Sequence, residues 1–344
     1  MSGRTPLLVL LALTAASVDA PAQEPGPGDP TTIFVTGFSE PCRTEFNSEG
    51  DLFVKDGAVI YRVAPDGSST VFTEEVPDGR GFTFDAFDDM IVPSPGNSTI
   101  YKVSPEGVVT EFISVFNARR ARTGPDGSLW FAAIDSIHHY DAMGRHLASF
   151  DVMSQGGAAF GLRFSPSGEL YFSSWGGYWK LVDGVVVPVL TDVLPRAGGP
   201  TFDELGNIYT YHESVTEGDP HRVILYDSAW EVVDDAFVTD VEPPCGTMFG
   251  RDDDGSTNAR LFISQRDGTI VEANPAGIAA PGFPVVGLSL SEIDEEDCAD
   301  EVVGVPALSE NESTFLDVIG NNNGSYDVGD FRAYLVRTGV VDGS

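Results

Sequence analysis

Basic residues are scarce in this 344-residue chain, and lysine is nearly missing, with only Lys55, Lys102 and Lys180 present. Fifty-three acidic residues stand against 19 basic ones, which gives a formal net charge of −34 at pH 7. Nucleic acids require a basic surface that neutralises phosphates, and anionic membranes attract basic segments, so we expect neither as a partner. The acidic residues indicate either a solvated, self-repelling shell or a surface that binds cations.

Long apolar runs are missing beyond the N-terminus, so no later segment is expected to insert into a membrane. Residues 1–22 have the pattern of a secretory signal peptide, in which Arg4 precedes the apolar run 7–16 and Ala20-Pro21-Ala22 has the form of a cleavage site. We therefore expect a secreted, extracellular protein whose mature chain begins with a Pro/Gly-rich leader at 23–30. Its three cysteines then suggest one disulfide and one remaining thiol.

Helical periodicity is missing until the C-terminus, and a short repeated phrase is present instead. An apolar residue is followed by a few turn residues and then by Leu, Ile or Met with further apolar residues; the instances are FNSEGDLFV (46–54), FDAFDDMIV (84–92), TGPDGSLWF (123–131), FSPSGELYF (164–172), FDELGNIYT (202–210) and FGRDDDGSTNARLFI (249–263). The central residues, which we call the anchors, are Leu52, Met90, Leu129, Leu170, Ile208 and Leu261. Their spacings of 38, 39, 41, 38 and 53 residues are typical of propeller blades with four short strands each.

The predicted fold class is therefore all-β, a six-bladed β-propeller at 31–275 with a small C-terminal calcium-loop and helix appendage. The rival architecture is a two-sheet β-sandwich, which six equal repeats disfavour. Residues 276–312, apolar and Pro/Gly-rich at first and then acidic, are expected to be a linker, and 313–344 the appendage.

Closure of the ring can also be predicted. Residues 31–37 resemble the fourth strand of a blade but precede the first anchor, and the sixth blade has no clear fourth strand, so we expect 31–37 to complete it. Cys42 lies ten residues before Leu52, and Cys245 lies at the matching point of blade six. A Cys42–Cys245 disulfide would clasp these neighbouring blades, whereas the alternative is that Cys298 pairs with one of them.

The blade phrases, best exemplified by Gly161-Leu-Arg-Phe-Ser-Pro-Ser-Gly-Glu-Leu-Tyr-Phe-Ser, resemble the six-bladed family of senescence marker protein and gluconolactonase, and also streptogramin lyase and NHL-type propellers. The resemblance implies a divalent metal held by Glu, Asn and Asp at the inner-strand starts. At the matching positions this chain has Cys42, Phe160 and Gly198, which cannot supply those oxygen ligands. We therefore expect the lactonase site to be missing.

Two groups of residues could instead form a ligand-binding face at the channel mouth. Trp175 and Tyr178 are aromatic candidates for stacking on sugar or peptide, although this loop could equally pack between blades. Arg80, Arg119, Arg120 and Arg122 form a cluster that could bind an anionic group or neutralise acidic neighbours. His212, beside Glu213, is a candidate base whose alternative is a surface residue.

The C-terminal segment carries oxygen ligands around a glycine bend. With Gly324 at position six of a calcium loop, Asn321, Asn323, the Ser325 carbonyl, Asp327 and Asp330 fall at positions three, five, seven, nine and twelve. The segment resembles one type I dockerin repeat, a module that docks onto cohesins, which implies bound calcium and a cohesin-type partner. Position one is Ile319, with Asp317 two residues early, and a second repeat is missing. The alternative is an Asn/Gly turn before a helix.

The function expected from these observations is that of a secreted, calcium-stabilised binding module for an extracellular small molecule, glycan or protein. The alternative is a secreted hydrolase or lyase that uses the same channel mouth. An acid/base constellation on the inner-strand rim would distinguish them, and the sequence offers aromatic residues and arginines there instead.

Overall fold

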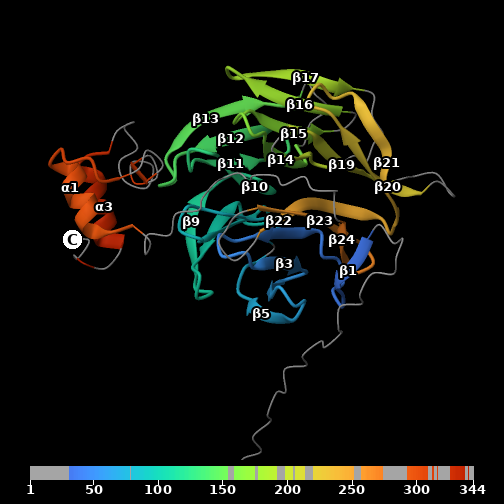
Figure 1. Cartoon of the computed structure of the whole chain (residues 1–344), viewed down its shortest axis with the longest axis horizontal. Coiled ribbons are helices and arrows are strands. Elements are labelled where there is room, and N and C mark those ends of the chain that lie inside the picture. The colour runs from blue at the N-terminus through green and yellow to red at the C-terminus, as the bar shows by residue number, and fades with distance from the viewer. Residues whose placement is uncertain are drawn as a thin grey trace, which may run out of the picture.

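The computed structural model describes residues 31–77, 79–153, 159–174, 177–191, 198–203, 206–213, 220–251, 257–273, 293–308, 312–313, 316, 326–337 and 340. Six four-stranded antiparallel sheets are arranged as the blades of a propeller (Figure 1), which confirms the predicted fold class. In every blade the strands are paired with their neighbours in sequence, and the innermost strand comes first, apart from the closing strand described below.

The strands of the first three blades follow one another in chain order. They are β2 (Arg43–Phe46), β3 (Leu52–Asp56), β4 (Val59–Val63) and β5 (Ser69–Thr73); β6 (Thr83–Phe84), β7 (Met90–Ser94), β8 (Thr99–Val103) and β9 (Val109–Ser114); and β10 (Arg120–Thr123), β11 (Leu129–Ala132), β12 (Ser136–Tyr140) and β13 (His146–Asp151).

Blades four to six use the remaining strands. They are β14 (Gly161–Phe164), β15 (Leu170–Ser174), β16 (Gly177–Val182) and β17 (Val185–Thr191); β18 (Thr201–Phe202), β19 (Ile208–His212), β20 (His221–Tyr226) and β21 (Val232–Val241); and β22 (Pro244–Arg251), β23 (Thr257–Gln265), β24 (Ile270–Ala273) and β1 (Thr31–Val35).

The repeated phrase explains both the core and the first turn of each blade. All six anchors are at most 3% exposed, and five of them begin the second strand of their blade. The turn before the anchor closes by a side-chain bond: Asn47 accepts from the amide of Asp51 at 2.8 Å, and Asp203 accepts from the amide of Asn207 at 2.8 Å. Short polar side chains stabilise turns in this way, so the phrase couples a local turn to a buried strand.

The ring is closed by the N-terminal strand, as predicted. Strand β1 pairs antiparallel with β24, so blade six combines the beginning and the end of the propeller sequence (Figure 1). Val35 and Phe46 then share a core cluster with Phe262 and Met248, which joins blade one to blade six. Cys42 and Cys245 are bonded, with Cα atoms 5.1 Å apart, which confirms the predicted pairing. Cys298 is a buried free thiol.

Helices α1 (Glu295–Val302) and α3 (Val328–Arg337) of the described residues lie beside the propeller (Figure 1). They share a core that contains Cys298 and Tyr334, and this core includes Ala86 and Phe87 from the turn between β6 and β7. Helix α1 lies in the stretch that we expected to be a linker, so the helical unit extends N-terminally of residue 313. Within the described residues, no helix is both long and apolar enough to span a bilayer.

Candidate functional site

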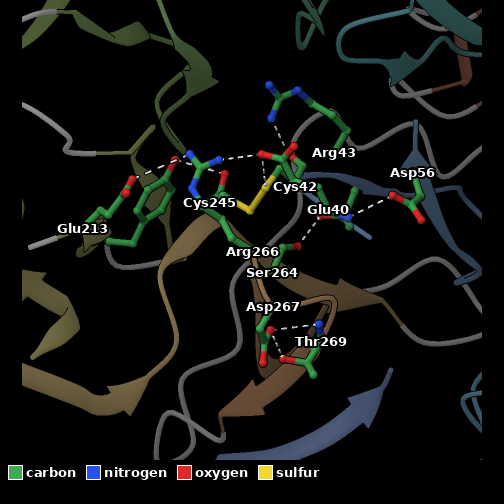
Figure 2. Close-up of a disulfide and its surroundings, with 12 residues drawn as sticks. Glu40, Cys42, Arg43, Asp56, Glu213, Cys245, Ser264, Arg266, Asp267 and Thr269 are labelled. Carbon is green, nitrogen blue, oxygen red and sulfur yellow. Dashed lines mark hydrogen bonds and ion pairs between the residues drawn. A yellow bond between two sulfur atoms is a disulfide. The ribbon is translucent and has the colours of Figure 1, made fainter. Parts of the chain in front are cut away.

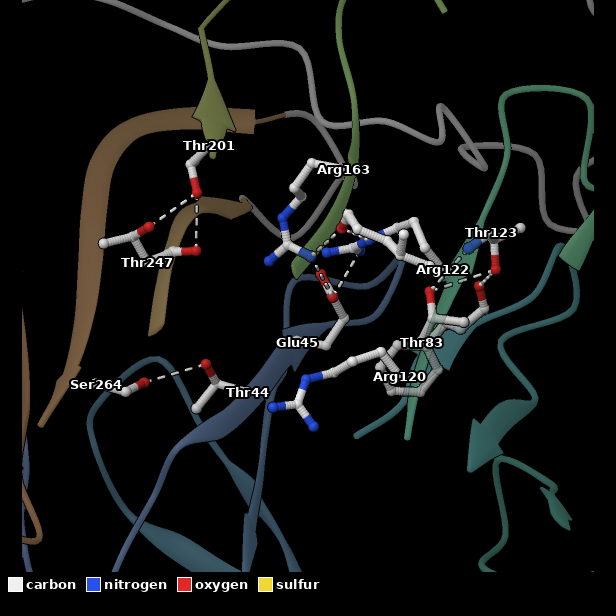
Figure 3. Close-up of polar contacts among 12 residues, drawn as sticks. Thr44, Glu45, Thr83, Arg120, Arg122, Thr123, Arg163, Thr201, Thr247 and Ser264 are labelled. Carbon is white, nitrogen blue, oxygen red and sulfur yellow. Dashed lines mark hydrogen bonds and ion pairs between the residues drawn. The ribbon is translucent and has the colours of Figure 1, made fainter. Parts of the chain in front are cut away.

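The innermost strands of all six blades surround a central cavity. Neighbouring blades are tied together there by short hydroxyl side chains, which Figure 3 shows. The hydroxyl pairs are Thr44–Ser264 at 3.2 Å, Thr83–Thr123 at 3.3 Å and Thr201–Thr247 at 3.0 Å. The second and third bonds join the innermost strands of adjacent blades, and the first joins β2 to β23, so together they fix the spacing of the blades around the cavity.

The cavity has a volume of about 630 Å³, within the range of roughly 300–1,000 Å³ that is usual for ligand pockets. Apolar residues line part of it, among them Phe82, Phe160 and Met248. Its charged lining residues are Arg43, Arg120, Arg163 and Arg266, with Glu40, Glu45 and Glu213. In a strongly acidic protein, this concentration of arginine at one point makes the cavity the outstanding candidate site.

Glu45 is held by arginines from two other blades (Figure 3). Its carboxylate lies 2.7 Å from Nη1 of Arg122 and 3.9 Å from Nη1 of Arg163. The Arg122 side chain is only 4% exposed, and its Nε also donates to the carbonyl of Leu162. Glu45 therefore serves as the counter-ion of an arginine that has few water contacts.

Glu40 and Glu213 both lie near Arg266, as Figure 2 shows. Oε1 of Glu40 is 2.5 Å from Nη1 of Arg266, and Oε2 of Glu213 is 3.6 Å from its Nη2. Among the described residues, each of the three carboxylates that line the cavity is thus engaged by an arginine. This leaves none of them an evident unpaired general base.

The Tyr211 ring lies against Gly198, the position at which the lactonase resemblance implies an aspartate. A Cβ atom at Gly198 would lie 1.9 Å from the Tyr211 ring, so any side chain at position 198 would displace the tyrosine. The Tyr211 hydroxyl donates to the carbonyl of Cys245 at 3.0 Å, and burial raises its pKa, so it is a neutral group at physiological pH.

The residues at the implied metal position do not fit a divalent cation. Cys42 is bonded in the disulfide, and Phe160 has no side-chain oxygen. At position 198 only glycine fits beside the Tyr211 ring. In the part of the chain that the structure describes, no three His, Cys, Asp or Glu side chains gather as a metal site requires. We therefore derive no metal chemistry for the cavity.

The arginine cluster expected from the sequence is divided by the structure. Arg120 lines the cavity and Arg122 forms the ion pair with Glu45, because alternate residues of β10 face the same side. Arg119 is exposed and its Nε donates to Asn117 at 3.3 Å. Arg80 contributes its carbonyl oxygen, which accepts from the guanidinium groups of Arg43 and Arg120.

The other ligand-binding candidates lie elsewhere. Tyr178 is fully buried against Trp230, with ring centroids 4.7 Å apart, which corrects the expectation of an exposed stacking surface at this residue. His212 is 5% exposed and does not line the cavity, because it points to the opposite side of β19 from Tyr211. Burial and the nearby Arg222 lower the pKa of His212 to about 4, so it is neutral at physiological pH. Trp175 lies outside the described residues.

Only two of the predicted calcium ligands can be placed. Asp330 is buried in the first turn of α3, and its Oδ2 accepts from the amide of Asp327 at 2.7 Å. Asp327 in turn accepts from the amide of Gly329. Asp317, Asn321, Asn323 and Ser325 lie outside the described residues.

Arg43, Arg163 and Arg266 were not identified from the sequence. Arg43 and Glu45 share a side of β2, and Arg163 is paired in register with Tyr171 within a blade phrase. Alternation along the inner strands was the available signal, since it distinguishes residues that face the channel from those that face the next blade.

Comparison with known proteins agrees with the architecture. No protein-family model matches the sequence, and no curated protein matches it. Among solved structures, a putative gluconolactonase is similar with a TM-score of 0.61 at 14% identity, over 75% of this chain and 96% of that chain. Regucalcin from Agrobacterium tumefaciens strain C58, described as a calcium-binding protein, has a TM-score of 0.54 at 17% identity, over 73% and 96%. A streptogramin B lyase has a TM-score of 0.51 at 17% identity, over 67% and 78%. Such identities indicate a shared fold and leave the activity open.

Proposed function

We propose that this chain is a secreted β-propeller that binds an extracellular small molecule in its central cavity. The observation that carries the proposal is the cavity itself, about 630 Å³ in volume, lined by all six blades and by both apolar and charged side chains. Pockets of this kind, with a few convergent polar groups, are the usual sites of ligand binding. The engagement of Glu40, Glu45 and Glu213 by arginines favours binding over hydrolysis or lyase chemistry.

A variant that fills the cavity tests this proposal. Gly246 lines the cavity, and a Cβ atom there would make only an ordinary contact of 3.7 Å with Ser264, so the larger side chain of Gly246→Trp can enter the space. Val185→Trp adds the same bulk at a residue that is 60% exposed on blade four, and is the matched control. Ligand-observed NMR with a library of sugars, organic acids, amino acids and phenols compares the three proteins.

We expect at least one compound to bind the wild type and Val185→Trp, and to lose at least tenfold in affinity for Gly246→Trp. Absence of any bound compound, or binding that survives in Gly246→Trp, rejects the cavity as the binding site. Turnover of a lactone in the library by the wild type, lost in Gly246→Trp, supports the hydrolase alternative in place of a binding module.

The export part of the proposal is supported by the sequence of residues 1–22, which lie outside the described structure. A clasping disulfide is also typical of proteins in oxidising compartments. N-terminal sequencing of the exported protein checks it, with Gln23 expected as the first residue.

We also propose that the dockerin-like segment binds one calcium ion. The proposal is supported by the ligand spacing around Gly324 and by Asp330, whose buried carboxylate lies at the start of α3.

In calorimetric titration of the mature chain with calcium chloride, Asp330→Asn should weaken binding at least tenfold, because it removes a charged ligand and keeps the side-chain oxygen that accepts from Asp327. Asp183→Asn, in an exposed turn of blade four, is the control. No heat of binding in the wild type, or equal affinities in all three proteins, contradicts the proposal. A cohesin-type partner would be tested on the same three proteins.

A further inference from the structure

Two cavity arginines are brought together, and no carboxylate of the described residues lies between them. Nε of Arg43 and Nη1 of Arg120 both donate to one atom, the carbonyl oxygen of Arg80. Two guanidinium groups that share an acceptor lie close together, and their positive charges repel each other. The proximity is built into the blades, since Arg43 belongs to β2 and Arg120 to β10.

The remaining bonds of these two side chains also go to backbone carbonyls. Nη1 of Arg43 donates to the carbonyl of Cys42 at 2.5 Å. Arg120 donates from Nε to the carbonyl of Phe160 at 2.9 Å and from Nη1 to that of Arg119 at 3.0 Å. Within the described residues, these contacts orient both groups and leave the two N–H donors of each Nη2 without a protein acceptor.

In the described part of the chain, the one carboxylate that acts on this pair is already held by another arginine. Glu40 is the carboxylate that acts on Arg43, and it is in contact with Arg266. Desolvation lowers the pKa of Arg43, and desolvation together with the positive charge of Arg43 lowers that of Arg120 to about 9. Both groups are nevertheless cationic at neutral pH, so their charges are incompletely compensated in the ring.

We propose that Arg43 and Arg120 form an oxyanion site within the cavity, and that the ligand is a small organic carboxylate. The inference rests on the proposed function and deepens it by naming the chemical class of the ligand. Guanidinium N–H groups bind carboxylates by charge-assisted hydrogen bonds. The Tyr211 hydroxyl on the same wall already donates its proton to the carbonyl of Cys245, so the donors for the ligand come from the two guanidinium groups. Phe82, Phe160 and Met248 line the same cavity and give it apolar surface for the rest of the molecule.

The charge of the whole protein restricts the size of this anion. At physiological ionic strength the Debye length is about 8 Å, so a small carboxylate inside the cavity responds mainly to the adjacent arginines. A long polyanion would also lie along the acidic exterior, whose contribution to the net charge of −34 repels it. The arrangement therefore selects a small anion.

Calorimetry on the mature chain tests the inference with three carboxylates and their neutral counterparts as probes. The pairs are 4-hydroxybenzoate with 4-hydroxybenzamide, galacturonate with galactose, and tartrate with threitol. We expect at least one carboxylate to bind at least tenfold more tightly than its neutral counterpart.

Arg43→Gln and Arg120→Gln should each weaken that binding by about tenfold to a hundredfold, as charge-assisted hydrogen bonds are worth about 1.5–3 kcal/mol. Arg145→Gln changes the net charge equally at an arginine whose side chain is 70% exposed on blade three, and should have no effect.

The outcomes separate this inference from the proposed function. Equal affinity for the two members of every pair, failure of all three carboxylates to bind, or unchanged affinity in folded Arg43→Gln and Arg120→Gln overturns the oxyanion site. The comparison of acid with neutral probe uses the wild type alone, so it decides the matter even if a variant does not fold. Neutral probes that bind the wild type and not Gly246→Trp would preserve the cavity function without the oxyanion site. Carboxylate binding that survives in Gly246→Trp would overturn both.

Discussion

Replacing both bonded cysteines, in Cys42→Ala with Cys245→Ala, is expected to lower the free energy of unfolding of the propeller by up to about 5 kcal/mol. The disulfide joins residues 203 positions apart, and the chain-entropy model assigns a cross-link of that length about 5 kcal/mol at 25 °C. The pairing of β1 with β24 also closes the ring and survives in the variant, so the measured loss should be smaller than this limit. Chemical denaturation followed by tryptophan fluorescence measures it.

Reductant provides the matched control for this prediction. The wild type and Cys298→Ala should both lose stability on reduction, since both contain the Cys42–Cys245 bond, while the double variant should not respond. A double variant as stable as the oxidised wild type would mean that strand pairing alone closes the ring. Loss of the disulfide should also shift the cavity residues Arg43 and Tyr211. Their side chains donate to the backbone carbonyls of Cys42 and Cys245, whose positions the bond fixes.

The closure of the ring was predictable because its signals are local and repeated. The anchors recur at nearly constant spacing, so residues 31–37 could be recognised as a displaced fourth strand, and Cys42 and Cys245 as equivalent positions in neighbouring blades. Each inference required only the order of strands within a blade. The structure bears out both the strand and the disulfide.

The lining of the cavity was less predictable because it depends on contacts between blades. Glu45 and Arg122 are 77 residues apart, and nothing in either blade phrase identifies them as partners. Arg119, Arg120 and Arg122 are alike in the sequence, whereas the structure exposes Arg119 and turns Arg120 and Arg122 inward on the same side of β10. Helix α1 was missed because its acidic residues resemble a linker; the signal was Asp294, which caps the helix by accepting from the amide of Glu296 at 2.8 Å.

The ion pair between Arg122 and Glu45 supports the second large effect, a loss of about 3 kcal/mol in the free energy of unfolding for Arg122→Met. Removing one partner of a buried pair costs about 3–5 kcal/mol, because the other charge is left desolvated. The lower end applies here, since Glu45 is 17% exposed and Arg163 is already within 3.9 Å of it. Chemical denaturation of the variant and the wild type at pH 7 measures the difference.

Arg145→Met is the matched control, because the Arg145 side chain is 70% exposed and its ion pair with Asp141 should contribute only about 0–1 kcal/mol. Adding Glu45→Gln to Arg122→Met should recover part of the lost stability, since the amide removes the unpaired charge. Equal losses in Arg122→Met and Arg145→Met would show that burial does not distinguish the two pairs.

If the two large losses are observed, the ring depends on Cys42–Cys245 at one point of the cavity wall and on Arg122–Glu45 at another. The arginines that hold Glu40, Glu45 and Glu213 would then have a structural role, and Arg43 and Arg120 would be the ones left for a ligand.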